Sequence, residues 1–454
     1  MHAEAFYQTQ SEGAVPLMLI NPSQWHEGKI ELSDGERCQL QSQAFKARLG
    51  QLCLIYTPSG QLAKAFLGQG EASEAQAMAY AATLLPEGDY ETAHSLSIFA
   101  QVNWALAQYR FDRYKKQERP PRRLVVPKEV MKTLKTDVEA VFLVRDLINT
   151  PSNDLSPLQL SEAVAELARQ YQADFCQWVG DELLAANFPA IHVVGRASEF
   201  EPRLIQLTWG KAEHPKIALV GKGVCFDSGG LDIKPALNMR LMKKDMGGAA
   251  NALGLAQWIM ANQLPVRLQV LIPAVENAVG SRAFRPGDVL TMRNGLTVEV
   301  DNTDAEGRLI LADAMVKACE EEPELLIDFS TLTGAARVAV GTEIAALFTG
   351  NDELAMTLSR LGEDIDDPVW RLPLFSGYDN MLDSTVADVI NASPSPYAGA
   401  ITAALFLKRF IHSPTQWIHF DIMAWNLASK PGKPEGGEAM GMRTIAHYLK
   451  ETYG

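Results

Sequence analysis

The stretch Asn302-Thr303-Asp304-Ala305-Glu306-Gly307-Arg308 concentrates charged side chains between two regular elements. A strand-like run, Leu296–Val300, precedes it, and a helix-like apolar run follows it. Because residues two apart in an extended segment point the same way, we expect Asp304, Glu306 and Arg308 to face one side together. Two acids and a guanidinium at the end of a strand are typical of a divalent-metal site. A solvated strand end with a salt bridge is the alternative interpretation of the same residues.

A second charged stretch, Lys222–Gly230, follows another apolar strand-like run, Ile217–Val220. Lys234 and the segment Lys243–Ala249 continue it, and a helix is expected from Gly248 to Met260. Both charged stretches therefore lie at strand-to-helix junctions, which is where open α/β sheets bind their ligands. Two such junctions favour a binding site over isolated surface salt bridges.

Together, these stretches resemble the signature of the leucine aminopeptidase family, whose members are cytosolic dinuclear-metal peptidases. The similarity spans about residues 140–454, and residues 439–446 are nearest to the peptidase B branch. The matching segments are Asn302–Leu309, the series Lys222…Asp227…Lys234…Asp245, Thr331–Ala335 and Trp417–Asp421. The resemblance implies an exopeptidase that releases Leu- or Met-like N-terminal residues from peptides. It further implies a cytoplasmic homo-hexamer.

The resemblance also implies a ligand set for two divalent metal ions. Asp227 and Glu306 would bridge the ions, Asp304 would complete one of them, and Asp245 and Lys222 would complete the other. Lys222 can act as a ligand only when its amine is unprotonated. Oxygen-rich coordination with one nitrogen suits Zn²⁺ or Mn²⁺, with Mg²⁺ and Co²⁺ as alternatives.

Five further residues match functional positions of the family. Lys234 would face the developing oxyanion. Arg308 would hold a bicarbonate ion that acts as the general base. Met242, Thr331 and Gly334 would line the pocket for the first side chain and suit an apolar residue, although Met242 taken alone is equally typical of a core methionine.

The chain departs from the family after Asp421. Here it runs Ile422-Met423-Ala424, where the family usually has Ile-Ala-Gly. In relatives this region helps to shape the pocket for the first side chain.

Composition limits the class of protein. The chain has 454 residues, of which 47% are hydrophobic and 21% charged, as in soluble globular proteins of two or three domains. Its net charge of −14 argues against nucleic-acid binding by the whole chain. Five scattered cysteines suit a reducing compartment. We find no signal-peptide pattern at the start and no run of about 18 apolar residues that would predict a membrane span.

The order of elements predicts two α/β domains, residues 1–124 and 125–454. The first contains strand-like runs, Val15–Ile20 and Leu52–Tyr56, and helix-like runs from Ser73 to Leu85 and from Gln101 to Tyr114. A basic segment with paired prolines, residues 115–123, is expected to link the domains. The second domain is expected to hold a mostly parallel sheet, because helix-like runs alternate with strand-like runs at 191–194, 204–208, 217–220, 267–272, 297–300 and 325–329.

Three alternatives to the peptidase remain open at this point. The basic segment 115–123 could make the chain a DNA- or partner-binding protein on a peptidase scaffold, a minor hypothesis for an acidic protein. A dinuclear phosphoesterase would also use acids around two metals, but such sites usually recruit histidine, and none lies near either charged stretch. A serine hydrolase with Ser228 and His419 would not explain the surrounding acids and lysines.

Overall fold

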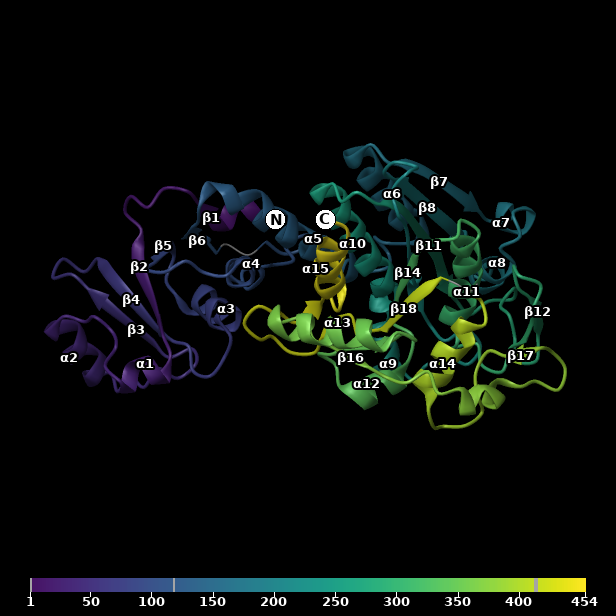
Figure 1. Cartoon of the computed structure of the whole chain (residues 1–454). Coiled ribbons are helices and arrows are strands. Elements are labelled where there is room, and N and C mark those ends of the chain that lie inside the picture. Colours follow the sequence, from purple (N-terminus) through teal and green to yellow (C-terminus); the bar gives the residue numbers. More distant parts are fainter. Residues whose placement is uncertain (1, 117–118, 412–414) are drawn as a thin grey trace. The chain divides into compact units, whose positions relative to one another are not determined.

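The structure is a computed structural model that describes residues 2–116, 119–411 and 415–454. The chain forms two compact units, both drawn in Figure 1. The first consists of Met1–Phe142 with Ala428–Glu435, and the second of Leu143–Leu427 with Gly436–Gly454. The units divide within α5 (Met131–Asn149). The boundary expected between residues 124 and 125 falls inside a strand of the first unit, because that strand pairs on both sides within the first sheet.

The first unit is built on a six-stranded sheet in the order β1-β6-β5-β2-β4-β3, counted over the described residues. Its strands pair in parallel except for β3 and β4, which are antiparallel. The strands are β1 (Tyr7–Gln8), β2 (Val15–Ile20), β3 (Leu52–Tyr56), β4 (Leu62–Gly68), β5 (Gly88–Thr92) and β6 (Arg122–Val125). The helices are α1 (Pro22–His26), α2 (Asp34–Ser42), α3 (Glu74–Leu84) and α4 (Ile98–Leu106).

Two expectations for the first unit meet different outcomes. Ser73 caps α3, since its side chain accepts a hydrogen bond from Gln76 N, as expected for a serine before a helix. The helix predicted from Gln101 to Tyr114 is wrong in its second half, because α4 ends at Leu106.

The basic segment is partly built into the first sheet. Its residues Gln117 and Glu118 lie outside the described residues. Arg122 donates from Nε to the Leu85 carbonyl oxygen at 2.5 Å, and Arg123 pairs with Asp89 at 2.6 Å. The linker prediction is therefore wrong for these two arginines, which are engaged by their own sheet.

The second unit contains a nine-stranded mixed sheet within the described residues, and the predicted α/β fold class with a mostly parallel sheet is confirmed. The order is β16-β15-β18-β14-β9-β11-β8-β7, with β10 beside β11. The central strands β18, β14, β9 and β11 run parallel, and antiparallel pairs flank them. The strands are β7 (Asp174–Val179), β8 (Arg203–Trp209), β9 (Lys216–Gly221), β10 (Gly223–Asp227), β11 (Arg267–Asn277), β14 (Leu325–Ser330), β15 (Ala345–Phe348), β16 (Val369–Arg371) and β18 (Gln416–Asp421).

Helices cover both faces of this sheet (Figure 1). α6 (Pro157–Tyr171), α10 (Gly247–Asn262) and α15 (Met442–Tyr453) lie on one side, and α8 (Pro189–Gly195), α11 (Glu306–Cys319) and α14 (Gly399–Lys408) lie on the other. The remaining elements include α7 (Glu182–Ala185), α9 (Ala236–Met239), α12 (Gly334–Val340), α13 (Asp352–Asp364), the 3₁₀ helices η3 (Met242–Met246) and η4 (Ser376–Leu382), and the short strands β12 (Val289–Thr291), β13 (Thr297–Glu299), β17 (Val389–Ile390), β19 (Trp425–Asn426) and β20 (Gly436–Gly437).

One predicted strand of the second unit is a helix. Residues 191–194 lie in α8, although a β-branched run is typical of strands. Pro189 occupies the first turn of α8, where its fixed φ and missing N–H are tolerated. The carboxylate of Asp313 accepts the free Ala190 N–H at 2.8 Å, so a distant residue stabilises the helix start.

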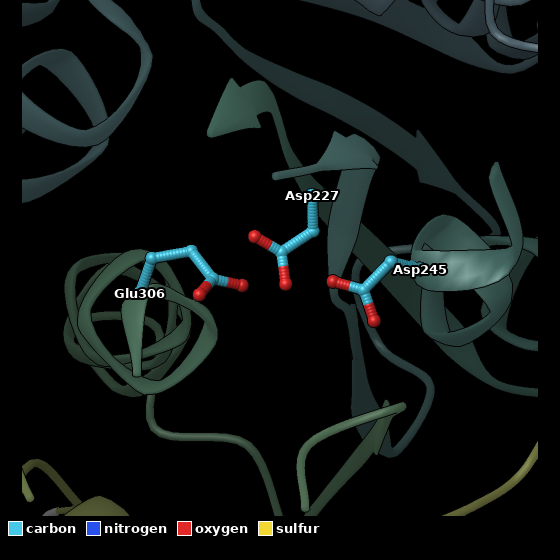
Figure 2. Close-up of side chains that lie close together, drawn as sticks. All are labelled: Asp227, Asp245 and Glu306. Atoms are coloured by element: carbon cyan, nitrogen blue, oxygen red, sulfur yellow. The ribbon is translucent and has the colours of Figure 1, made fainter. Parts of the chain in front are cut away.

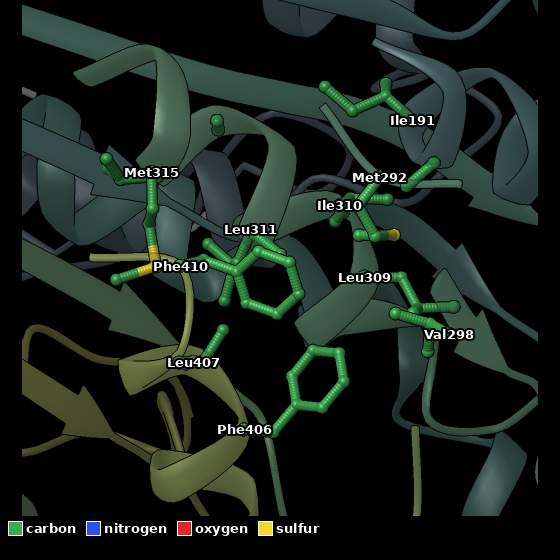
Figure 3. Packing of buried hydrophobic residues seen from close by; sticks show 14 of the residues in the cluster. Ile191, Met292, Val298, Leu309, Ile310, Leu311, Met315, Phe406, Leu407 and Phe410 are labelled. Carbon is green, nitrogen blue, oxygen red and sulfur yellow. The ribbon is translucent and has the colours of Figure 1, made fainter. Parts of the chain in front are cut away.

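Helix α11 is held by an apolar core that Figure 3 shows from close by. Leu309, Ile310 and Leu311 are fully buried among side chains of α8 and α14, including Ile191 and Phe406. Burial of apolar surface stabilises the folded protein by about 25 cal/mol for each Å² removed from water, and this burial holds the helix in place. The first turn of α11 is thereby fixed beside the ends of the central strands.

The start of α11 corrects one expectation. Glu306 and Arg308 do not lie in an extended segment, because the helix begins at Glu306 itself. The two side chains come from the first turn of a helix, so the alternation argument placed them correctly near Asp304 only by coincidence.

Among the described residues, no helix has both the length and the apolar character needed to cross a membrane.

Candidate active site and metal centre

Three buried carboxylates converge at the carboxyl end of the central strands. Asp227 is the last residue of β10, Asp245 lies in η3, and Glu306 is the first residue of α11. One oxygen of each lies within 4.8 Å of the others, and Figure 2 shows the three groups pointing toward one another. Because like charges buried together repel, such an arrangement needs cations to compensate it.

The oxygen atoms of this cluster fit a divalent cation. Asp245 Oδ2 and Glu306 Oε1 are buried without a hydrogen bond of good geometry, although both face the ammonium of Lys222. Burial raises the pKa of Glu306, and the neighbouring Asp227 carboxylate raises it further, against the opposing charge of Lys222. Carboxylate oxygens that converge in this way are the ligand set that hard divalent cations prefer.

Lys222 occupies the break between β9 and β10. Its Nζ lies 2.7 Å from Asp245 Oδ2 and 3.0 Å from Glu306 Oε1. Burial alone would lower the pKa of Lys222, but Asp245, Glu306 and Asp227 outweigh burial and raise it. Divalent cations held by the same carboxylates would reverse this shift and leave the amine free to act as a ligand. A Cβ on Gly307 would lie 2.4 Å from Lys222 Cε, so only glycine at this position of α11 leaves room for the lysine stem.

Lys234 joins Asp304 to the cluster. Its Nζ lies 2.7 Å from Asp227 Oδ2 and also contacts Asp304 Oδ1. Asp304 is the most open of the predicted ligands, with a side chain 32% exposed, and it lies outside the group of three convergent carboxylates. Burial and the Asp227 charge raise the pKa of Asp304. Each of the four predicted carboxylate ligands thus pairs with one of two lysines: Asp245 and Glu306 with Lys222, itself a predicted ligand, and Asp227 and Asp304 with Lys234.

Arg308 presents an unpaired donor to the site. Its Nη1 donates to the Asn391 carbonyl oxygen at 2.7 Å, whereas its Nε is buried without a hydrogen-bond partner. Burial lowers the pKa of Arg308 to about 10, and Asp421 and Glu306 oppose this effect, so the guanidinium stays charged near neutral pH. A buried cation with a free donor suits a small anion.

A cavity of about 730 Å³ opens onto these groups. Lys222, Asp227, Lys234, Asp245, Asp304 and Arg308 line it, together with all three residues predicted for the first side chain, Met242, Thr331 and Gly334. Glu306 is not among the lining residues. The cavity therefore brings the predicted catalytic, metal-binding and substrate-binding residues into one site.

Two residues that support the carboxylates were not predicted as such. Asn277, the last residue of β11, donates from Nδ2 to Asp227 Oδ1 at 2.9 Å and to the Thr303 carbonyl oxygen at 3.0 Å. Thr331 donates from Oγ1 to Asp245 Oδ1 at 2.7 Å, in addition to lining the cavity. A polar residue at the end of a central parallel strand was the available signal for Asn277.

Comparison with known proteins identifies the family. The profile described as "Cytosol aminopeptidase family, catalytic domain" matches residues 142–446, and that described as "M17 aminopeptidase, N-terminal domain" matches residues 15–127.

The chain belongs to the cytosol aminopeptidase family. It is accordingly an exopeptidase of the peptidase class of hydrolases. A probable cytosol aminopeptidase of Syntrophotalea carbinolica is 41% identical over 365 residues, which cover 76% of this chain and 73% of that protein. The corresponding protein of Rickettsia canadensis is 39% identical over 364 residues, with the same coverage of 76% and 73%.

Solved structures agree with this assignment. The crystal structure of the Coxiella burnetii cytosol aminopeptidase has a TM-score of 0.94 and 43% identity, covering 99% of this chain and 100% of that one. The bottromycin maturation enzyme BotP in complex with Mn has a TM-score of 0.87 and 31% identity, covering 96% and 99%.

The serine-hydrolase alternative lacks the geometry it needs in this cytosol aminopeptidase fold. Ser228 donates from Oγ to the Asn277 carbonyl oxygen at 2.7 Å. His419 is fully buried, and its Nδ1 lies 2.6 Å from Asp328 Oδ1 on the neighbouring strand β14. Within the described part of the chain, no hydrogen bond joins Ser228 to His419. Neither residue can therefore activate the other as found.

Proposed function

We propose that this protein is a dinuclear-metal aminopeptidase whose ions are held by Lys222, Asp227, Asp245, Asp304 and Glu306. The observation that carries the proposal is the convergence of Asp227, Asp245 and Glu306 oxygens within 4.8 Å beside a substrate-sized cavity. Zn²⁺ and Mn²⁺ suit this ligand set best, with Mg²⁺ and Co²⁺ as alternatives. The Mn complex of BotP, a structural neighbour, supports manganese as a candidate.

Two divalent cations in such a site supply Lewis-acid activation of a water molecule and of the scissile carbonyl. The protein's own side chains orient the substrate carbonyl and the general base. Lys234 would place its ammonium against the oxyanion that develops on the carbonyl oxygen. Its position beside Asp227 and Asp304, at the mouth of the cluster, supports that role.

Arg308 would hold the general base rather than act as one. Its buried, unpartnered Nε is the donor that a bicarbonate ion would take. The anion would accept the proton of the attacking water, because an arginine keeps its own proton near neutral pH. This division of roles explains why no histidine is found among the described residues that line the cavity.

The first residue of the substrate would enter the cavity with its free α-amine toward the carboxylates. Met242 and Thr331 are nearly buried in the cavity wall, and Gly334 leaves space beside them. This lining favours Leu- or Met-like side chains. Cleavage would therefore stop at the first peptide bond, as in an aminopeptidase.

The same proposal includes assembly and location. We expect a homo-hexamer in the cytoplasm, supported by the resemblance to cytosolic peptidases and by the relatives' designation as cytosol aminopeptidases. Peptides are the expected partners.

The described part of the basic segment gives little support to DNA binding, since Arg122 and Arg123 are engaged by their own sheet.

A substrate comparison tests the proposal. The purified protein is stripped of metal, reloaded with Mn²⁺ or Zn²⁺, and assayed on leucyl-p-nitroanilide, its N-acetylated form and p-nitrophenyl phosphate. We expect metal-dependent cleavage of the free-amine anilide alone. Cleavage of the phosphate ester instead would favour the phosphoesterase, and equal cleavage of the acetylated anilide would remove the requirement for a free α-amine.

A further inference from the structure

One fully buried asparagine outside the predicted site connects several parts of it. Asn391 directly follows β17 and is 0% exposed, and the next residue, Ala392, lines the cavity. The backbone N–H of Asn391 donates to the Glu299 carbonyl oxygen at 2.9 Å, which continues the parallel pairing of β17 with β13. A buried carboxamide is costly unless its donors and its acceptor are used, so its partners show what the residue holds.

The side chain of Asn391 binds the loop that carries Asp304. Its Oδ1 accepts the backbone N–H groups of Asp301 and Asn302 at 2.8 and 3.2 Å, and its Nδ2 donates to the Asn302 carbonyl oxygen at 2.7 Å. A longer contact of 3.4 Å joins Nδ2 to the carbonyl oxygen of Ala305, the residue before α11. One carboxamide therefore holds both ends of this loop.

The backbone of the same residue holds Arg308. The Asn391 carbonyl oxygen accepts from Arg308 Nη1 at 2.7 Å, and in the described part of the chain this is the only hydrogen bond of the guanidinium. Because a guanidinium is a rigid plane, fixing Nη1 restricts the direction of Nε. Arg308 Nε is buried without a partner and is the donor proposed for bicarbonate. The place of Asn391 therefore influences where that donor points.

We infer that Asn391 is a positioning residue for the anion that acts as general base. It fixes the guanidinium of Arg308 and the loop before α11 in one arrangement, so that the anion binds beside the attacking water. Asn391 is absent from the described residues that line the cavity, so it acts through Arg308 and the loop rather than on the substrate. This inference rests on the proposed aminopeptidase function and on the role proposed there for Arg308.

The response to bicarbonate tests this role. We expect Asn391→Ala to raise the bicarbonate concentration that gives half-maximal cleavage of leucyl-p-nitroanilide by about tenfold or more, the usual effect of losing a residue that orients a functional group. Saturating bicarbonate should restore most of kcat, and bound metal should stay near the wild-type value. A purely structural role would lower stability without shifting that concentration.

Two further variants make the test specific. Asn391→Asp keeps the shape of the side chain but loses its donors, so it should shift the concentration in the same direction even if the alanine variant does not fold. Asn251→Ala is the matched control. Asn251 is also fully buried, donates to the Gly247 carbonyl oxygen at 2.8 Å and accepts the Met440 N–H at 3.0 Å. Its loss should lower stability and keep the wild-type response to bicarbonate.

Two measurements need no turnover. In the metal-free protein, hydrogen exchange followed by mass spectrometry should be faster in Asn391→Ala for the peptide that contains Asp301 and Asn302, because their N–H groups lose an acceptor. Titration of ¹³C-bicarbonate onto the Zn²⁺-loaded protein, followed by NMR, should show weaker binding by a similar factor.

A double-mutant cycle tests whether Asn391 acts through Arg308. Arg308→Ala removes the guanidinium, so adding Asn391→Ala to it should lower kcat/KM little further, because residues that act as one unit are not additive. Effects that multiply would show that Asn391 acts independently of Arg308 and would overturn the inference.

The remaining outcomes are distinct. An unchanged bicarbonate response in the folded Asn391 variants, or loss of metal in proportion to activity without recovery at saturating bicarbonate, would overturn the inference. Wild-type cleavage that does not depend on bicarbonate would also overturn it, while the metal-ligand assignment would stand. If the metal-loaded protein cleaves no anilide, the proposed function fails, and the exchange and NMR measurements still decide whether Asn391 holds the loop and the anion.

Discussion

At the scale of single residues, Glu306 is central to the proposed chemistry as a metal ligand. It is 1% exposed, and it shares a cluster with Asp227 and Asp245. Replacing it with glutamine keeps the shape and removes the negative charge that a bridging ligand needs.

We therefore expect Glu306→Gln to lower kcat/KM for leucyl-anilide by more than the roughly 10–100-fold that loss of an outer-shell partner costs. The circular-dichroism spectrum should remain that of the wild type, and bound metal measured by mass spectrometry should fall. Glu353→Gln, an exposed acid on α13, is the control. Wild-type turnover in Glu306→Gln would show that the residue is not a ligand.

Lys234 allows catalysis to be separated from metal binding. We expect Lys234→Ala to lower kcat by about 10²–10³-fold, as for loss of one donor to an oxyanion, with little change in metal content. The exposed Lys211→Ala variant controls for loss of a surface charge. An equal loss of metal and activity would instead make Lys234 a ligand or a structural support.

Short motifs made most residues of the candidate site predictable. Lys222, Asp227, Asp304 and Glu306 stand in compact segments whose residue types have few structural uses together. Asn277 has no such motif, and its contact with Asp227 depends on the parallel pairing of β10 with β11. Pairing between distant segments is not visible in a single sequence.

At the scale of elements, Asp313 couples α11 to α8. It is fully buried and accepts backbone N–H groups of Ala190 at 2.8 Å and Arg293 at 3.0 Å. Burial raises the pKa of Asp313 to about 7, although these N–H donors oppose the shift. Because the folded protein then holds a proton that the unfolded chain releases near pH 4, its stability falls as pH rises from about 4 to 7.

Asp313→Asn removes this titration. The variant's free energy of unfolding, relative to that of the wild type, should rise by on the order of 2–4 kcal/mol between pH 4 and pH 7 and level off above. Urea denaturation at several pH values measures it, with the exposed Asp364→Asn as control. A difference that stays constant with pH would show that Asp313 is ionised in the folded protein throughout.

Gly248 sets how closely α10 approaches the sheet. A Cβ there would lie 2.1 Å from the Phe329 carbonyl oxygen and 2.8 Å from Lys222 N, both backbone atoms. Gly248→Ala should therefore destabilise the protein by about 1–3 kcal/mol or more, by displacing the helix from the strands.

Gly35, an exposed glycine in α2 with no atom near its added Cβ, is the matched control. Gly35→Ala should stabilise its helix by about 0.5–1 kcal/mol, because alanine is the better helix former. A Gly248→Ala variant that also gained stability in thermal denaturation would mean that α10 has room to move.

Elements were predicted well where the local pattern and the tertiary context agree. The strands β2, β9 and β14 appear where apolar runs predicted them. Residues 191–194 became a helix because Pro189 and the distant carboxylate of Asp313 favour one, and only the first of these is local. The division of the chain within α5 has no local signal for a similar reason, since the pairing of β6 with β5 and β1 is a tertiary property.

At the scale of the whole molecule, exposed apolar side chains favour assembly. Several large apolar side chains of the second unit are more than half exposed, including Leu237, Val338, Trp370 and Tyr397. Exposed apolar surface of this kind is typical of an interface. We expect light scattering to give a mass of about six times the 49.8 kDa chain. A monomer mass at micromolar concentration would contradict the expected hexamer without affecting the ligand assignment.

The central claim is that Lys222, Asp227, Asp245, Asp304 and Glu306 hold two divalent cations. Anomalous diffraction from crystals grown with Mn²⁺ tests it most directly, because the signal locates the metal itself. We predict two peaks, one among Asp227, Asp245, Glu306 and Lys222 and one among Asp227, Asp304 and Glu306. A map without peaks between these side chains, or with peaks only elsewhere on the protein, would contradict the account.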